Sequence, residues 1–483
     1  MNRKWFLSTL SILTRFSTGA GVSLLAAGCH SLPTAPASPT TLWEPSSYSS
    51  YDEVAAWTAP STTAPAMNEP LTLGILQTNA ITSNPVLQQR LQQARQSEAR
   101  MRQAMSAWYP TADVGATLGV SDSDADGVIS NRLTATTLGP QASLSWLLLD
   151  FGTRSATLRA ALLDTLAANH QFNQTFQDVV LEVHVAYYDL LGAQAFITAS
   201  QTNLATSATT LDAATLKESG GLGTRLDRLR AQTDYEQSRS QLESARAAEA
   251  TAKSRLAASV GWPASTPLNV VMPQAKLPDE SDWPEERVEE WINQALAQRP
   301  DVAAAHLAVL AAEHKWRATR AERYPRLTGG VQAEQTDHRY SNSAIEDRDS
   351  TEYSAQLALT FNVFDGRLTA NRIQAAAEAL EEARQRNREI ELAVSKFVWD
   401  RYYELRSAIR QLGFSRAALD SAEEAFAMTD ERYRSGLCDI VFLLDVQNSL
   451  STARRTWISA VNDVFVAQIR LTHAMGMLGQ DTP

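Results

Sequence analysis

The sequence predicts an α+β protein with a two-fold internal repeat, in which a barrel of long helical coiled coils continues into four strands of a shared transmembrane β-barrel. Three observations support this fold class. Landmark residues recur at one fixed separation, proline is absent from two long stretches, and short segments alternate apolar with polar residues. With 44% hydrophobic and 20% charged residues among 483, the chain has the composition of a folded protein.

The N-terminal segment has the composition of a secretory signal peptide. Three basic residues, Arg3, Lys4 and Arg15, precede the modest apolar run "FSTGAGVSLLAAG", which ends in small residues directly before Cys29. The run is too short and too interrupted to persist as a membrane-spanning helix. We therefore expect residues 1–28 to be removed from the mature protein.

Cys29 is the predicted site of a covalent lipid such as palmitate. The stretch "LLAAGC" resembles the lipobox of bacterial lipoproteins, in which the cysteine after the cleavage site becomes the acylated N-terminus. The alternative is an ordinary signal peptide followed by a chance cysteine. His30, in place of the Asp that retains lipoproteins at the inner membrane, indicates export to the outer membrane. Each buried methylene of the acyl chains would contribute roughly 0.8 kcal/mol to the anchor.

Residues 29–70 are rich in Pro, Ser, Thr and Ala, and we expect an extended tether that leads away from the lipid. Loss of residues 1–28 removes three positive charges, so the formal net charge changes from −11 to −14. Because the secreted chain is so acidic, no nucleic-acid partner is expected. With Cys29 acylated, Cys438 has no cysteine to pair with, so no intrachain disulfide is expected.

The landmark residues indicate two copies of one structural unit. Each landmark in the first half has a counterpart 215 positions later, and an offset kept over so long a span indicates duplication. The pairs are Pro85 and Pro300, Tyr109-Pro110 and Tyr324-Pro325, Asp150 and Asp365, Tyr187-Tyr188 and Tyr402-Tyr403, Gly221-Leu222 and Gly436-Leu437, Gln232 and Gln447, and Gly261 and Gly476. Residues 71–266 are the predicted first repeat, 267–285 a linker, and 286–481 the second repeat.

Each copy opens with an amphipathic helix, over 85–108 and 300–323, that ends at a Tyr-Pro pair. Two strand-like stretches of ~10 residues follow, and in "TADVGATLGVS" and "QASLSWLLLD" apolar residues fill every second position. The second copy repeats the alternation from Leu327 to Ala333 and from Tyr353 to Phe361. The intervening segments, "SDSDADGVISN" and "TDHRYSNSAIEDRDSTE", are polar and acidic, so we expect water-exposed loops there.

Two very long helical regions come next, because no proline occurs from 141 to 262 or from 326 to 482. Between Phe176 and Leu211 the apolar positions step by four and three residues in turn, which is a coiled-coil seam with some polar members. A helix over about 153–217 would be roughly 95 Å long at ~1.5 Å per residue. Such a rod must pack lengthwise on other rods.

The strands, each with one apolar and one polar face, suit an outer-membrane β-barrel. By alternation alone, a small antiparallel sheet packed on a soluble core is an equal alternative. The signal peptide, the lipid site and the lack of an apolar stretch of spanning length favour the barrel. Four strands cannot close a barrel, and an open edge in lipid leaves backbone groups unpaired, so the barrel must be shared between chains.

The sequence resembles the TolC-like outer-membrane efflux proteins, and more closely their lipoprotein branch, the NodT-like proteins of RND-type efflux systems. The resemblance covers almost all of the mature chain. It rests on the duplicated helix, strand pair and long hairpin, on the Tyr-Pro pairs, on "LLLDFGTR" and "FNVFDGRL" at the strand-to-helix junctions, and above all on "RYRSGLCDIVFLLDVQ".

The resemblance implies a homotrimer that pools its strands into a twelve-stranded barrel in the cell outer membrane and extends as a helical tunnel into the periplasm. Such a protein is the passive exit duct of a tripartite efflux pump, and it docks with a periplasmic adaptor (membrane fusion) protein and an inner-membrane transporter. Two alternatives remain at this point. One is a type I secretion exit duct, and the other is a non-conducting, lipid-anchored periplasmic coiled-coil scaffold.

In this family the two hairpin turns form the periplasmic tip, and here they correspond to "KESGGLGTRLDRLRAQ" and "RYRSGLCDIVFLLDVQ". Gly221 and Gly436 suit these reversals, because a turn between helices commonly needs a positive φ. By position in the motif, the resemblance places Asp445 and Asp227 at acidic positions of the channel gate and Val441 at an apolar constriction.

Three copies of one carboxylate around a narrow axis would repel one another, select against anions and bind cations. The alternative for Asp445 is a solvated position on a helix face. The residues expected to tie the tip to acidic groups across the junction are Arg228, Arg230, Arg432 and Tyr433. Exposed pairs contribute only ~0–1 kcal/mol each, so a docking adaptor could break them.

Enzyme classes find little support. The seven histidines show no metal-ligand spacing, and the chain contains neither a phosphate-binding loop nor a nucleophile elbow. Most carboxylates lie in helical charge patterns such as "EALEEARQRNREIE", which are typical of solvated helix faces. We therefore expect no enzymatic activity, no metal site and no cofactor other than the lipid on Cys29.

Overall fold

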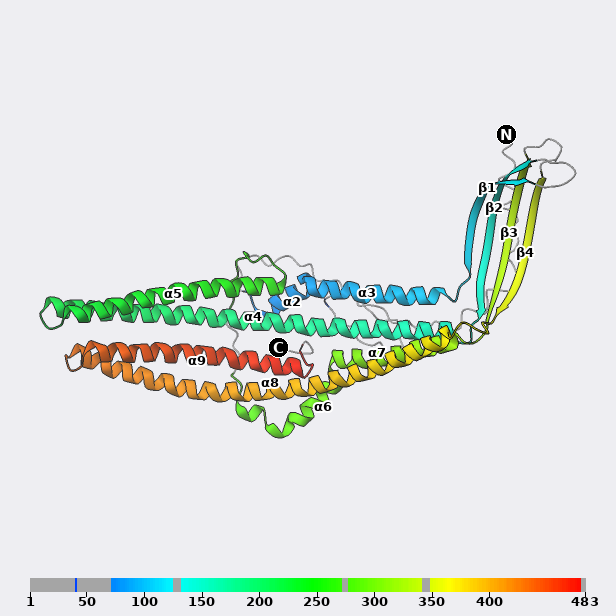
Figure 1. Cartoon of the computed structure of the whole chain (residues 1–483). Coiled ribbons are helices and arrows are strands. Elements are labelled where there is room, and N and C mark those ends of the chain that lie inside the picture. The colour runs from blue at the N-terminus through cyan, green and yellow to red at the C-terminus, as the bar shows by residue number, and fades with distance from the viewer. Residues whose placement is uncertain (1–39, 41–70, 125–131, 272–276, 341–347, 479–483) are drawn as a thin grey trace.

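The computed structural model describes residue 40 and residues 71–124, 132–271, 277–340 and 348–478 (Figure 1). The predicted signal peptide, Cys29 and nearly all of the predicted tether lie outside these described residues.

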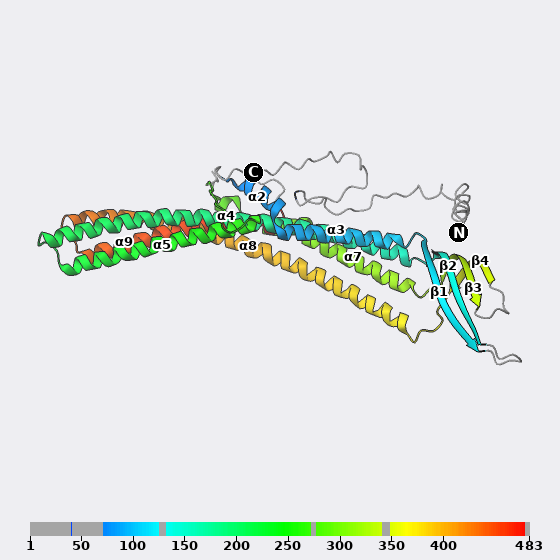
Figure 2. The ribbon, with the colours of Figure 1, turned by 90° about the horizontal axis from the view of Figure 1, so that it is seen from above.

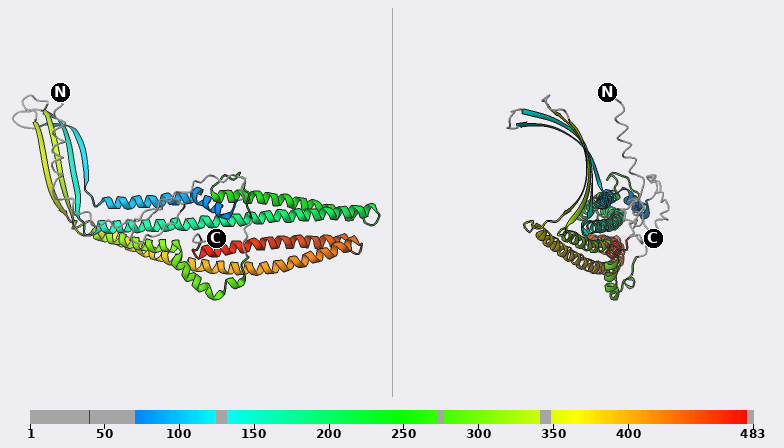
Figure 3. Two further views of the ribbon diagram at one scale, coloured as in Figure 1. Left: turned by 180° about the vertical axis from the view of Figure 1, so that it is seen from behind. Right: turned by 90° about the vertical axis from the view of Figure 1, so that its right-hand side faces the viewer.

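Long helices lie side by side along one axis, and a four-stranded sheet stands at one end of them, turned steeply away from that axis (Figures 1 and 3). This arrangement confirms the predicted α+β class. The helices are α2 (Leu73–Ser83), α3 (Pro85–Ser106), α4 (Thr153–Ser219), α5 (Arg225–Val260), α6 (Val288–Gln298), α7 (Pro300–Ala321), α8 (Leu368–Arg434) and α9 (Ile440–Ala474), with two short 3-10 turns, η1 (Glu280–Asp282) and η2 (Glu285–Arg287).

The two halves of the chain have the same order of elements, as the duplication predicts. In each half a helix of 22 residues, α3 or α7, leads into two strands and then into a helix of 67 residues, α4 or α8. At ~1.5 Å per residue the long helices extend about 100 Å. The prediction of proline-free rods is thus confirmed, and α4 continues two residues beyond the expected position 217.

Each long helix reverses at its far end and returns as a second helix, so that α4 pairs with α5 and α8 pairs with α9. The two hairpins are joined because α4 also packs against α7 and α9. Helix α7 contacts α4 and α8, which diverge toward the sheet (Figure 2). The cores repeat as well: Tyr187 and Tyr402, 215 positions apart, are each 1% exposed within separate apolar clusters.

A duplicated joint fixes the end of each returning helix. The side chain of Asn84, directly before α3, donates to the carbonyl of Ser259 at the end of α5, at 2.8 Å. Arg299, at the equivalent place before α7, donates to the carbonyl of Ala474 at the end of α9, at 3.0 Å. Both pairs keep the offset of 215, and both satisfy a carbonyl that the helix end leaves unpaired.

The sheet is antiparallel throughout, in the order β1-β2-β3-β4. Its strands are β1 (Thr111–Asp124), β2 (Arg132–Leu149), β3 (Arg326–Tyr340) and β4 (Arg348–Thr360). At 13 to 18 residues they are longer than the expected ~10, because the ladders continue into the polar segments that were expected to be loops. Strand pairing satisfies the backbone whatever the side chains are, so apolar alternation underestimates strand length.

One face of this sheet is apolar and uncovered. Val114 on β1 is 88% exposed and Leu357 on β4 is 72% exposed, and no described helix packs across the sheet (Figure 1). This finding contradicts the alternative of a small sheet covered by a soluble core. Among the described helices, none combines the length and hydropathy that crossing a membrane requires.

Candidate functional site

Two glycines end the long helices at the far end of the molecule, which we call the tip (residues 217–229 and 432–445). Gly221 has φ +70° and Gly436 has φ +76°, as the sequence predicts for such turns. The amide of Leu222 donates to the carbonyl of Lys217 at 2.8 Å, and the amide of Leu437 donates to that of Arg432 at 2.8 Å. Both turns are therefore Schellman motifs, which need a left-handed residue after the helix.

The returning helices begin with capped turns at equivalent positions. Thr224 and Asp227 form a capping box, in which the Thr224 side chain accepts from the Asp227 amide and the Asp227 carboxylate accepts from Thr224. Asp439 caps α9 by accepting from the Phe442 amide at 2.9 Å. Hydrogen bonds from the side chain and backbone of Thr224 lower the pKa of Asp227, so this carboxylate stays charged while it holds the turn.

The two hairpins meet at the tip around Tyr433, which is 4% exposed. Its neighbours in one apolar cluster are Ala214 of α4, Ala231 of α5, and Ile440 and Leu443 of α9. Burial is the main reason that the pKa of Tyr433 is raised. Apolar packing therefore holds the tip within one chain.

Lys217 adds a polar contact between the hairpins. Its Nζ lies 3.7 Å from the centre of the Tyr433 ring and donates a hydrogen bond to the backbone carbonyl of Tyr433. Lys217 lies in the last turn of α4 and Tyr433 in the last turn of α8, so the contact joins the far end of one hairpin to that of the other. A cation over an aromatic face contributes ~0.5–2 kcal/mol, more when water is excluded.

The predicted gate residues lie on the surface of the single chain. Val441 and Asp445 are exposed one turn apart on the same face of α9. Arg228 pairs with an acidic residue: its guanidinium lies 2.6 Å from Glu218 of α4 in the same hairpin, because the turn brings α4 and α5 together there. Arg230 and Arg432 are exposed. At the tip, Lys217 makes a hydrogen bond between the hairpins, to the backbone carbonyl of Tyr433.

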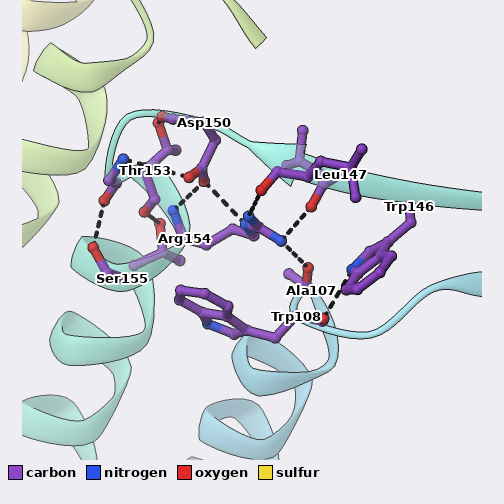
Figure 4. Close-up of polar contacts among 11 residues, drawn as sticks. Ala107, Trp108, Trp146, Leu147, Asp150, Thr153, Arg154 and Ser155 are labelled. Carbon is purple, nitrogen blue, oxygen red and sulfur yellow. Dashed lines mark hydrogen bonds and ion pairs between the residues drawn. The ribbon is translucent and has the colours of Figure 1, made fainter. Parts of the chain in front are cut away.

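A second constellation lies where β2 passes into α4 (Figure 4). The Asp150 carboxylate accepts from the backbone amide of Arg154 at 2.6 Å and from its Nε at 3.2 Å. The same guanidinium donates to the carbonyls of Ala107, Leu147 and Leu148 at 2.6–3.3 Å. Arg154 is buried, so one side chain satisfies a carboxylate and three carbonyls at the corner between sheet and helix.

Two tryptophans complete this junction. The Arg154 guanidinium lies 4.6 Å from the ring centre of Trp108, and the indole nitrogen of Trp146 donates to the Trp108 carbonyl at 3.1 Å (Figure 4). Together these contacts connect the end of α3, the end of β2 and the start of α4.

The second junction repeats the backbone but not the buried arginine. Phe151 and Gly152 have φ +52° and +101°, and their counterparts Gly366 and Arg367 have φ +64° and +72°. At each junction two successive left-handed residues thus reverse the chain between the strand and the helix. The glycine is the second of the two at the first junction and the first of the two at the second junction. Asp365 accepts from the backbone amide of Thr369 at 2.9 Å, and Thr369 stands where the first copy has Arg154.

The family model described as outer membrane efflux protein matches residues 76–262 and 291–477, once in each half of the chain. The chain belongs to the outer membrane efflux protein family. It is an exit duct of the outer membrane, as the sequence predicts, and its family is one of transport proteins rather than of enzymes.

Relatives and solved structures agree with this assignment. The chain is 28% identical over 359 residues to Protein CyaE of Bordetella pertussis. These aligned residues cover 74% of this chain and 73% of CyaE. It is 29% identical over 185 residues, 38% of each chain, to the pyoverdine export outer membrane protein OpmQ of Pseudomonas putida. The CmeC outer membrane channel of Campylobacter jejuni has the same fold, with a TM-score of 0.75, 14% identity and coverage of 85% and 87%.

In this efflux protein, the sequence did not single out Lys217 at the tip or Arg154 at the first junction. Arg154 had a signal, because an Asp four residues before an Arg at the start of a helix can pair with it. Lys217 had none, because its partner Tyr433 is 216 positions away and the contact depends on how the hairpins approach.

Proposed function

We propose that three copies of this chain assemble into one continuous duct, with a twelve-stranded barrel in the outer membrane and a helical tunnel in the periplasm. The observation that carries the proposal is the sheet. Its apolar face is exposed, and within the described part of the chain β1 and β4 each pair with one strand only, which leaves two open edges.

Open edges and an apolar face are compatible with lipid only if other copies cover the edges, since unpaired backbone groups are unfavourable in hydrocarbon. A ring of identical chains does this by placing β4 of one copy beside β1 of the next. The helical part supports the same assembly. Exposed apolar residues run along α8 at Leu392, Trp399, Phe414 and Met428, a surface that is typical of a partner contact.

We infer that the duct serves as the outer component of a tripartite efflux pump. Helices of about 100 Å reach far from the sheet, and the tip turns present exposed leucines, Leu222 and Leu437, at the opposite end. Apolar residues at an exposed end suit docking to a periplasmic adaptor, which in turn would connect the duct to an inner-membrane transporter. Substrates would then pass through passively.

At the tip we propose that Asp445 and Val441 line the narrowest part of the duct, and that Asp227 adds acidic charge nearby. Val441 and Asp445 share one exposed face of α9, which three-fold symmetry would repeat around the axis. Three carboxylates close together repel anions and attract cations. We expect Asp445→Asn to weaken selection for cations, measured as reversal potential in a salt gradient.

We also propose that the mature N-terminus is anchored through a lipid on Cys29, with residues 30–70 as the tether. The proposal rests on the sequence "LLAAGC". Metabolic labelling with palmitate should mark the wild-type protein and not Cys29→Ser. Equal labelling of both would contradict it.

The duct is tested with purified full-length protein in planar lipid bilayers. We expect discrete single-channel currents, together with a trimer that dissociates only on heating in denaturing detergent. A rod that gives no current and migrates as a monomer without heating would contradict the duct and favour the scaffold alternative.

A further inference from the structure

The two hairpins of the chain meet along α4 and α9, and we call this contact the intrachain seam. Ala195 of α4 and Ile458 of α9 line one small apolar space in it. Closer to the tip, Ser207 of α4 accepts a hydrogen bond from Nε2 of Gln447 on α9, at 2.8 Å. The first hairpin therefore contributes its outgoing helix to the seam, and the second hairpin contributes its returning helix.

The internal repeat gives the chain a second pair of helix faces in equivalent positions. An offset of 215 relates α4 to α8 and α5 to α9. The chain thus carries on α8 the counterpart of the α4 face, and on α5 the counterpart of the α9 face. The four helices pack in the order α5, α4, α9, α8, which places α5 and α8 on the two outer sides (Figure 1). A second copy can bring these outer faces together, and such a head-to-tail contact generates a ring when it closes.

Both outer faces are exposed in the single chain. Phe414 of α8 is 75% exposed and Leu229 of α5 is 43% exposed. The other exposed members are Ser407, Arg410, Ala418 and Ala425 on α8, and Gln232, Glu236, Arg239 and Glu243 on α5. In the register of the intrachain seam, the small residues Ala422 and Ala425 lie opposite the longer side chain of Gln232. Side chains of unequal size can therefore interdigitate there.

Opposite charges coincide at two places in this register, the first of them midway along the helices. Ala195 and Ile458 lie together in the intrachain seam, and their counterparts are Arg410 of α8 and Glu243 of α5. Both charged residues are exposed in the single chain. An apolar pair within the chain thus corresponds to a basic and an acidic residue between copies, and complementary charge favours this register over others.

The second charged pair lies at the tip. Lys217 of α4 contacts Tyr433 of α8 within the chain. Their counterparts are Arg432, which is exposed, and Glu218. Glu218 binds Arg228 of its own hairpin through Oε2, and a carboxylate has a second oxygen that can accept from another arginine. The pair between copies is therefore compatible with the contact that Glu218 already makes.

We propose that α8 of one copy binds α5 and the end of α4 of the next copy in the register of the intrachain seam, with Arg410 against Glu243 and Arg432 against Glu218 of the next copy. The proposal rests on the ring assembly proposed above and adds which helices meet and in what register. Seams within and between chains then alternate around the ring, so closure of the tip depends on Arg432 as well as on Lys217.

The register is tested by disulfide cross-linking of the full-length protein in membranes, with Cys438→Ser as the background. Ala422→Cys combined with Gln232→Cys is the counterpart of Ser207 and Gln447, which are in direct contact. We expect mild oxidation to link copies of this variant into covalent dimers and trimers. The matched control combines Ala422→Cys with Ala247→Cys, an exposed position about 22 Å farther along α5, and should not cross-link.

The charged pair at the tip is tested by a double-mutant cycle, measured as the temperature at which the trimer dissociates in denaturing detergent. Arg432→Gln should lower this temperature by a few degrees in the wild-type background, and it should have little further effect once Glu218→Gln is present. Arg434→Gln is the matched control. Arg434 pairs with Asp430 of its own helix, so its substitution should leave the dissociation temperature unchanged.

Each outcome separates the seam from the assembly on which it rests. Trimers in which Ala422→Cys and Gln232→Cys stay unlinked, or in which the Ala247→Cys control links equally well, would overturn the register and leave the duct standing. An equal effect of Arg432→Gln with and without Glu218 would overturn the ion pair at the tip. Monomers in every sample would overturn the ring assembly and the seam with it.

Discussion

Lys217 holds the two hairpins together at the tip with its charge and one donated hydrogen bond, and it does so without the Tyr433 hydroxyl. The ammonium lies over the ring and bonds to the backbone carbonyl. Substitutions of Lys217 and of Tyr433 can therefore distinguish the effect of the cation on tip closure from the effect of the hydroxyl.

We expect Lys217→Met to loosen the tip, because methionine keeps an apolar stem but loses the cation over the ring, a loss of about 1 kcal/mol or more. Single-channel conductance in bilayers should rise. Tyr433→Phe is the matched control and should conduct as wild type does, since it keeps the ring and the carbonyl. Equal opening by Tyr433→Phe would show that the hydroxyl, and not Lys217, holds the tip.

Arg154 is the corresponding residue at the first junction. Arg154→Met leaves the Asp150 carboxylate and three carbonyls without this donor, and breaking a buried pair costs about 3 kcal/mol or more. Thr369→Val, at the equivalent position of the second junction, removes one hydroxyl from a more exposed site and should cost about 1 kcal/mol. Thermal unfolding of both variants checks this, and equal losses would mean that the two junctions are equally dependent on their side chains.

At the scale of elements, glycines with the same left-handed backbone differ in what surrounds them. Gly261, at the end of α5, has φ +89°, and an added Cβ would lie 2.7 Å from the carbonyl oxygen of Ser83. Gly436, at the tip, has φ +76° and open space around it. Gly261 is needed both for the turn and for the close approach to Ser83, whereas Gly436 is needed for the turn alone.

We therefore expect Gly436→Ala to destabilise the protein by about 1 kcal/mol, the usual penalty of a left-handed residue with a side chain. Gly261→Ala should cost clearly more, because the backbone of Ser83 at the end of α2 and of Asn84 at the cap of α3 must also move. Chemical denaturation of the two variants compares them directly. Similar losses would contradict the close approach at Ser83.

The contact between α2 and α4 depends on a buried histidine. His184 is buried on α4 and contacts Gln77 of α2, and burial lowers its pKa to about 4 from an ordinary 6.5. The folded protein thus favours neutral His184. Its contribution to stability is complete above about pH 6.5 and decreases as the pH falls toward 4, because the unfolded chain takes up a proton there.

Between pH 7 and pH 4.5, wild type should lose about 2 kcal/mol more stability than His184→Gln, which keeps a polar side chain but cannot titrate. Denaturant unfolding at several pH values measures the difference. Parallel curves for the two proteins would show that His184 is not protonated on unfolding in this range.

At the scale of the whole molecule, the two faces of the sheet should respond differently to charge. Leu357→Arg places a cation on the exposed apolar face, which would cost ~2–4 kcal/mol in the middle of a bilayer and less near its surfaces. Gln356→Arg, one residue away on the opposite face, should be tolerated. The yield of trimers in outer-membrane fractions checks both, and equal yields would contradict a lipid-facing apolar side.

Much of this architecture could be predicted from local patterns. The absence of proline predicted both long helices, the offset of 215 predicted two equivalent halves, and Gly221 and Gly436 marked the turns. The predicted strand ends were wrong, because the hydrogen bonding between strands continues through polar residues. These residues lack the apolar-polar alternation by which a strand is predicted.

The sequence by itself determined the repeat, the rods, the turns and the exposed apolar strands, since each depends on residues close in the chain or on a period that the chain repeats. Only the tertiary structure decided which side chains meet between hairpins. Lys217 of one hairpin reaches Tyr433 of the other. The structure also decided that Arg154 at the first junction, and Thr369 at the equivalent place of the second, pair with the preceding aspartate. Contacts between hairpins depend on how closely two long helices approach one another. The local sequence pattern of either helix does not determine that distance between the helices.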